Sequence, residues 1–197
     1  MIETRNLTRR YALLMPLVLA ACGGHEVEPV FEPLHYDYLP PIQLNVATID
    51  VEQRFIPSGV PPDITAQDPE PPVDALKAMA NGRLKPFGTS GRAVFAILDA
   101  SFTKQEDVIN AVMSVSLTVY GADGNQGGFA EARIEHRQSG RIENLHKTLY
   151  DITKTMMDEM NVEFEFQARQ HLRDWLTTTA VPDTPVEQAP LEQPTPH

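Results

Sequence analysis

Two stretches of alternating apolar and polar residues, separated by a turn, limit the fold of this chain more than any other feature. From 111 to 119 every second residue is apolar, and from Met113 onward serine or threonine stands between them, which is typical of a strand with one buried face. The segment 122–127 (ADGNQG) contains Asp-Gly, a frequent hairpin turn. Alternation resumes over 128–137. We therefore predict two strands that pair antiparallel.

Two segments before this hairpin also carry the period of regular structure. Residues 42–51 alternate, and the phase changes near Ala47-Thr48, which indicates one strand with a bulge. A helix is predicted over 73–85, where apolar residues recur every fourth position. Pro86 and Gly88 should end that helix.

The remaining elements complete the fold class. The apolar run within 92–102 predicts a strand that is buried on both faces or central in its sheet. Residues 144–177 repeat apolar side chains every three or four positions, which predicts a long helix with Asn144 as its N-cap. The order β-α-β-β-β-α predicts an α+β two-layer sandwich, in which two helices cover one mostly antiparallel sheet.

Proline-rich stretches indicate the limits of the domain. The composition of residues 22–41 predicts a flexible tether, and that of residues 179–197 predicts a disordered acidic tail. The segment 57–72 holds six prolines and predicts a loop without regular structure. The single α+β domain is therefore expected over 42–178.

The N-terminus has the pattern of a secretory leader, predicted over 1–21. Three arginines precede an apolar stretch, Tyr11 to Ala21, that is far shorter than the roughly 20 residues that span a bilayer. Leu19-Ala20-Ala21 then leads directly into Cys22, which is the only cysteine of the chain.

This pattern resembles the lipobox of bacterial lipoproteins, in which the cysteine is acylated and becomes the first residue after cleavage. The resemblance implies that Cys22 is the lipidation site and carries three acyl chains, and two or more chains hold a protein stably at a membrane. Under the sorting rule known for some of these lipoproteins, Gly23 in place of Asp implies the outer membrane. We expect a protein anchored by lipid on the periplasmic face.

The charge of the chain disfavours two classes of binding partner. The formal net charge is −11, and the predicted leader removes three of the 16 basic residues. So acidic a chain argues against nucleic-acid binding and against adhesion to anionic lipid through a basic patch. The only local concentration of basic residues is Arg133, Arg137 and Arg141. An acylated Cys22 leaves no thiol for a disulfide, so an apolar core must provide the stability.

No motif for catalysis or metal binding is present. None of the six histidines stands at ligand spacing with another His, Cys or carboxylate. The calcium-loop pattern that starts at Asp123 fails, because Gly127 and Ile134 fall where oxygen ligands are needed. The GTSG segment 88–91 has Arg92 where a nucleophile elbow needs glycine. We predict no catalytic residue, no metal, no cofactor and no enzymatic activity, with a periplasmic hydrolase as the least favoured alternative.

The predicted long helix carries the one candidate surface for binding a partner protein. If it extends beyond its sheet, part of its apolar stripe lacks a core beneath it, and Phe164 and Trp175 would then form a partner surface. Met156, Met157 and Met160 form a soft cluster that fits core filling better than a lipid groove.

From Cys22 to Thr177, the order of elements resembles two groups of envelope lipoproteins. One plugs the outer-membrane barrel that assembles lipopolysaccharide, and the other comprises auxiliary lipoproteins of envelope lipid transporters. The resemblance implies a non-enzymatic accessory or scaffold in envelope assembly or in lipid or lipopolysaccharide transport. The alternative is a tethered protein-binding or regulatory module. Both imply attachment to the membrane through the lipid anchor and a protein partner in the envelope.

Overall fold

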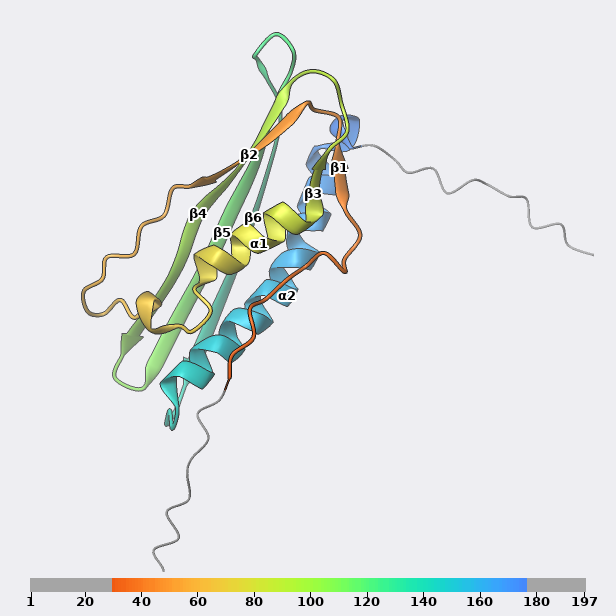
Figure 1. The fold of residues 1–197 in the computed structure, drawn as a ribbon. Coiled ribbons are helices and arrows are strands. Elements are labelled where there is room, and N and C mark those ends of the chain that lie inside the picture. Colours follow the sequence, from red (N-terminus) through yellow and green to blue (C-terminus); the bar gives the residue numbers. More distant parts are fainter. Residues whose placement is uncertain (1–29, 177–197) are drawn as a thin grey trace, which may run out of the picture.

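The computed structural model describes residues 30–176, which form an α+β fold with two helices and two sheets (Figure 1). The larger sheet has four strands, whose order across the sheet is β2 (Thr48–Gln53), β4 (Arg92–Gln105), β5 (Val108–Tyr120) and β6 (Gln126–Ser139). Strand β5 is antiparallel to both of its neighbours, β4 and β6, whereas β2 lies parallel to β4. The predicted α+β class, with two helices and mostly antiparallel strands, is confirmed.

The predicted hairpin is present with longer strands. Met113 of β5 lies opposite Ile134 of β6, so the side chains of both alternating patterns share one face. That face is turned toward the core, because Met113 is buried. The turn between the strands contains Gly124 at a φ of 79°, a left-handed conformation that glycine adopts without strain.

The segment predicted as one strand, 42–51, instead contributes to two sheets. β1 (Ile42–Leu44) pairs parallel with β3 (Leu84–Pro86) in a separate two-stranded sheet, and β2 pairs with β4. Between them the Val46 N–H donates to the Leu44 carbonyl at 2.8 Å, so the chain turns there. The change of phase in the sequence marks a corner between sheets and not a bulge, and the prediction of a single sheet is wrong.

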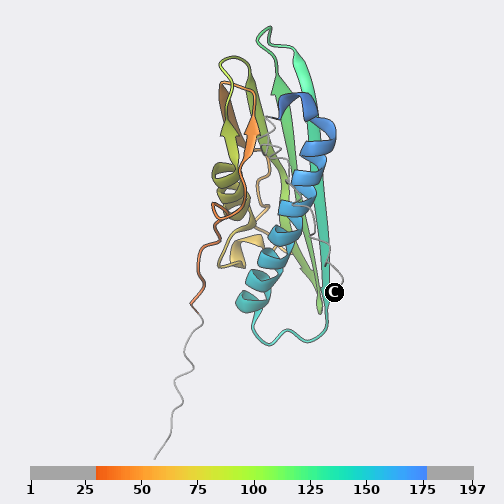
Figure 2. The same cartoon turned by 90° about the vertical axis from the view of Figure 1, so that its right-hand side faces the viewer.

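Two helices lie on one face of the large sheet, α1 (Pro72–Arg83) and α2 (Leu145–His171) (Figure 2). Asn144 is the N-cap of α2, as predicted, and its side-chain oxygen accepts from the Lys147 N–H at 2.9 Å. α2 ends earlier than predicted because Leu172 leaves helical geometry. A short 3-10 helix, Arg173–Trp175, follows. The α1 prediction was also too long, since its last two residues belong to β3.

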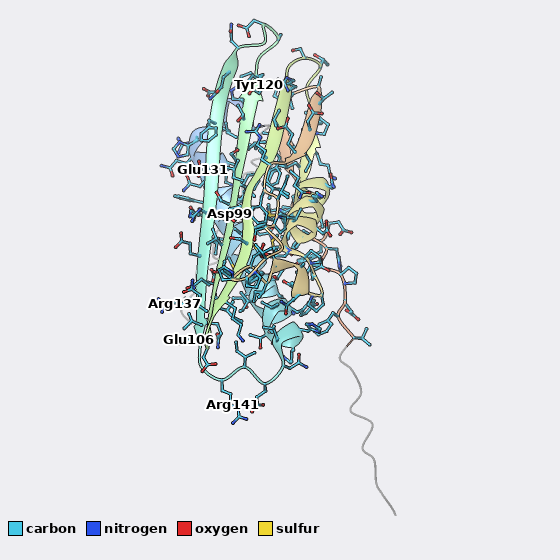
Figure 3. All side chains as sticks on the ribbon, turned by 90° about the vertical axis from the view of Figure 1, so that its left-hand side faces the viewer. Asp99, Glu106, Tyr120, Glu131, Arg137 and Arg141 are labelled. Atoms are coloured by element: carbon cyan, nitrogen blue, oxygen red, sulfur yellow. The ribbon has the colours of Figure 1, made fainter. Side chains whose placement is uncertain are left out.

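The core fills the layer between the helices and the sheet. Met156, Met157 and Met160 are fully buried there, so the prediction of core filling is confirmed. No helix among residues 30–176 is long and apolar enough to cross a membrane. Figure 3 views the other face of the sheet, with Asp99 near its middle and Glu131 on the β6 side, and no described helix covers it.

Candidate functional site

Residues 30–41 lie against the helices and are called the strap below (Figure 1). The Phe31 ring packs on Tyr150 of α2 with 5.1 Å between ring centroids, and the Tyr150 hydroxyl donates to the Glu32 carbonyl at 2.9 Å. Tyr36 is buried. The prediction of a flexible tether is therefore wrong for these residues. Apolar side chains of the strap find cover on distant helices, which local composition cannot reveal.

The proline-rich segment 57–72 is ordered along the sheet. The Ile64 N–H donates to the Phe102 carbonyl at 2.9 Å, and the Lys104 N–H donates to the Pro62 carbonyl at 2.8 Å. The segment therefore follows the edge of β4 beyond the point where β2 ends. A short 3-10 helix, Thr65–Gln67, comes next and leads directly to Asp68.

A pocket of about 650 Å³ opens where the strap, the proline-rich segment and the start of α2 meet. It is lined by Phe31, Ala66, Gln67, Asp68, Pro69, Asn144 and His146. We call this end of the domain the proximal end. It includes the turn between β4 and β5, because the Gly140 N–H just before α2 donates to the Asp107 carbonyl of that turn at 3.1 Å. The distal end carries the turn between β5 and β6, 121–125.

Asp68 is the buried carboxyl of this pocket, with 4% of its surface exposed. Its Oδ1 accepts from the Glu70 N–H at 3.1 Å, and its Oδ2 accepts from the Thr153 hydroxyl of α2. Burial raises the pKa of Asp68 to about 6, although these hydrogen bonds and the nearby His146 act in the opposite direction. The side chain therefore gains or loses a proton near pH 6 while it joins the proline-rich segment to α2.

The pocket combines apolar and polar side chains. Both oxygens of Asp68 already accept hydrogen bonds, from the Glu70 N–H and the Thr153 hydroxyl. Apolar Phe31, Ala66 and Pro69 stand beside polar Gln67, Asn144 and His146. A ligand with an apolar part and a hydrogen-bonding part would find partners for both.

Asp68 is not among the residues that the local sequence patterns indicate. The residue lies in a proline-rich stretch, and Thr153, which donates to it, is 85 positions away. The only local signal is that Asp68 precedes Pro69, a pair typical of turns. A turn signal does not indicate burial or a pocket.

The predicted partner surface does not form as expected. Phe164 is 1% exposed, and its ring packs edge-to-face on Phe95 with 5.4 Å between centroids. Trp175 is partly buried, and its indole N–H donates to the Gly127 carbonyl at 3.2 Å. Phe164 is therefore a core residue, because α2 lies on the sheet where its apolar stripe was expected to be uncovered. The exposed apolar residues of α2 are Val162 and Phe166.

The predicted lipidation site, Cys22, lies outside the described residues, as do the leader and the acidic tail. Within residues 30–176, no three His, Cys, Asp or Glu side chains gather in a way that could hold a metal ion.

Comparison with known proteins finds similarity in solved structures only. No protein-family model matches the chain, and no curated protein sequence matches it. Lipoprotein GNA1162 from Neisseria meningitidis is similar over 60% of this chain and 99% of its own, with 11% identity and a TM-score of 0.29. A minor lipoprotein from Acinetobacter baumannii covers 60% of this chain and 93% of its own, with 11% identity and a TM-score of 0.28. At these scores neither structure says what this chain does.

Proposed function

We propose that this chain is a non-enzymatic accessory protein of the bacterial outer membrane, held on the periplasmic face by acylated Cys22. In this role it serves envelope assembly or lipid transport. The lipobox pattern at 19–22 supports the anchor, and the pocket supports the binding role.

The observation that carries the proposal is the position of the pocket relative to the anchor. Phe31 lines the pocket and is nine residues after Cys22. Nine extended residues reach about 30 Å at most. An anchor at Cys22 therefore keeps the proximal pocket close to the bilayer, where a lipid or a membrane-bound partner is concentrated.

The first test replaces the acylated thiol. We expect Cys22→Ser to take up no labelled fatty acid and to leave the membrane fraction of cells, because the variant has no atom to acylate. The unchanged chain is the control. If the variant stays in the membrane fraction and takes up as much label as the unchanged chain, the anchor is refuted.

The second test examines the pocket in cells. A photo-crosslinking amino acid replaces exposed Gln67 at the pocket, and in a matched variant it replaces exposed Asn125 at the distal turn. We expect the Gln67 position to capture an envelope lipid or protein that the Asn125 position does not capture. Equal or weaker capture at Gln67 would refute a binding role for the pocket.

The second candidate function is a tethered protein-binding module. Val162 and Phe166 of α2 are 72% and 57% exposed and stand four residues apart, so they are neighbours on one helix face. Changing both to Ser should remove a partner protein from a pull-down with the whole chain and leave crosslinking at Gln67 unchanged. If the partner protein stays in the pull-down and crosslinking at Gln67 is lost, the result favours the pocket as the binding site.

A further inference from the structure

Among residues 30–176, strand β6 is an edge of the large sheet. It pairs with β5 and stands last in the strand order of the described residues. It has 14 residues, and from Gly128 to Ser139 its pairing with β5 has no register shift. Natural sheets usually protect such an edge with proline, a bulge or charged side chains. From Gly128 to Ser139, β6 has no proline, lysine or bulge, and its protection comes only from glutamate and arginine side chains.

The open face of β6 carries charges of alternating sign. Glu131, Arg133, Glu135 and Arg137 are all exposed and occupy every second position, so they project to the same side. Figure 3 shows Glu131 and Arg137 along this margin of the open face. Within one chain, Arg133 and Glu135 form an ion pair of 2.8 Å.

We propose that two copies of this chain pair through β6, antiparallel and centred on Ile134. In this register Glu131 lies opposite Arg137 of the second copy, and Arg133 lies opposite Glu135 of the second copy. Two-fold symmetry repeats both contacts, so all four cross-strand pairs have opposite charge. Opposite charges in directly facing positions stabilise a pair of strands, and like charges destabilise it.

Neighbouring registers do not have this property. A shift of the centre by one residue places Arg133 opposite Arg133 or Glu135 opposite Glu135 of the second copy. A parallel pair in register would also place like charges opposite each other. The charge pattern therefore selects both the direction and the register of the proposed pair, and the result is a continuous eight-stranded sheet with the helices of both copies on one side.

The test is a charge swap in the full acylated chain, kept in detergent, with the molar mass measured by sedimentation. We expect the unchanged chain to be a dimer at micromolar concentration. Arg133→Glu should weaken the dimer by about tenfold or more, because glutamates then face each other. Adding Glu135→Arg restores opposite charges at these positions and should restore the dimer.

Arg54→Glu is the matched control. Arg54 forms the same kind of exposed ion pair, with Glu52 at 2.7 Å, just beyond β2 at the opposite side of the sheet. The Arg54→Glu substitution should leave the molar mass unchanged. If Arg133→Glu does not fold, Arg137→Glu with and without Glu131→Arg performs the same test.

A monomeric unchanged chain overturns the proposal. So does a dimer that is insensitive to the reversal at Arg133, or one that the second substitution does not restore.

Discussion

Asp68 and Asp63 lie five residues apart in the proline-rich segment, and folding shifts their pKa values in opposite directions. Burial raises the pKa of Asp68 to about 6. Burial acts on Asp63 in the same direction, but hydrogen bonds from Thr65, Gly59 and Ser58 outweigh it and hold the pKa of Asp63 well below its usual value. One carboxylate is therefore destabilised by folding, and the other is stabilised.

The sign of the pH dependence follows for Asp68. Its pKa is higher in the folded than in the unfolded protein, so its contribution to stability is complete below about pH 4 and is lost as the pH rises through 6. Asp68→Asn keeps the shape and the hydrogen-bonding capacity but has no charge to bury. We expect the unchanged chain to lose about 2 kcal/mol more of its unfolding free energy than this variant between pH 4 and pH 7.

Urea unfolding at a series of pH values measures this difference. Asp63→Asn is the control with the opposite sign, because it removes a carboxylate that is stabilised at neutral pH, so it should lower stability at pH 7. Parallel pH profiles for Asp68→Asn and the unchanged chain would show that Asp68 is not perturbed.

Among the elements, the strap and the two helices are joined by one buried side chain. Arg83 at the end of α1 is 2% exposed. Its guanidinium donates to the Pro40 carbonyl of the strap at 3.3 Å and to the Asn161 side chain of α2 at 3.1 Å. It also forms an ion pair with Glu165 of α2. A buried arginine with these partners holds three segments that are far apart in the sequence.

Arg83→Met should therefore lower the unfolding free energy by about 3 kcal/mol, because buried acceptors lose their donor. Arg169→Met is the matched control, since Arg169 pairs with the same Glu165 at 2.7 Å but is 69% exposed. An exposed pair contributes about 1 kcal/mol or less. Denaturant unfolding compares the two variants, and equal losses would contradict the assigned role of Arg83.

At the scale of the whole molecule, the proposed anchor and the proposed dimer together restrict the orientation on the membrane. Antiparallel β6 strands place the proximal ends of the two copies at opposite ends of the dimer. Both acylated Cys22 residues must reach the same bilayer. A membrane-bound dimer must then lie with its strands along the membrane plane.

This orientation predicts equal depths for the two ends of the domain. Asp107→Cys labels the proximal turn and Asp123→Cys labels the distal turn, and each introduces one free thiol because Cys22 is acylated. Fluorophores at both sites of vesicle-bound protein should be quenched by a headgroup quencher to within about twofold, because the distal turn of one copy lies toward the same end of the flat dimer as the anchored proximal end of the other copy.

In the Arg133→Glu background, a single anchor holds only the proximal end, and quenching at Asp123→Cys should fall. If Arg133 is unchanged and quenching is much stronger at Asp107→Cys than at Asp123→Cys, the result would contradict the flat dimer. Such a result would leave the anchor itself intact, because a monomer held at Cys22 also brings the proximal end to the membrane.

Much of the fold follows from local patterns. The alternation from 111 to 137 and the Asp-Gly turn predict the β5–β6 hairpin, and the N-cap at Asn144 begins α2 where predicted. Alternation also separates the core face of β5 from its open face. These features depend on residues within a few positions of one another, so the chain alone specifies them.

Contacts between segments that are far apart in the sequence decided the packing of the strap, of Asp68 and of Phe164. The strap packs because Phe31 meets Tyr150, and Asp68 is buried because Thr153 of α2 lies over it. Phe164 is a core residue because Phe95 of β4 lies beneath it. The sequence by itself determined the helices, the long strands and the hairpin, since hydrophobic period and turn chemistry are local. Only the tertiary structure decided that the strap, Asp68 and Phe164 are packed and where a pocket opens, because these contacts join segments that only folding brings together.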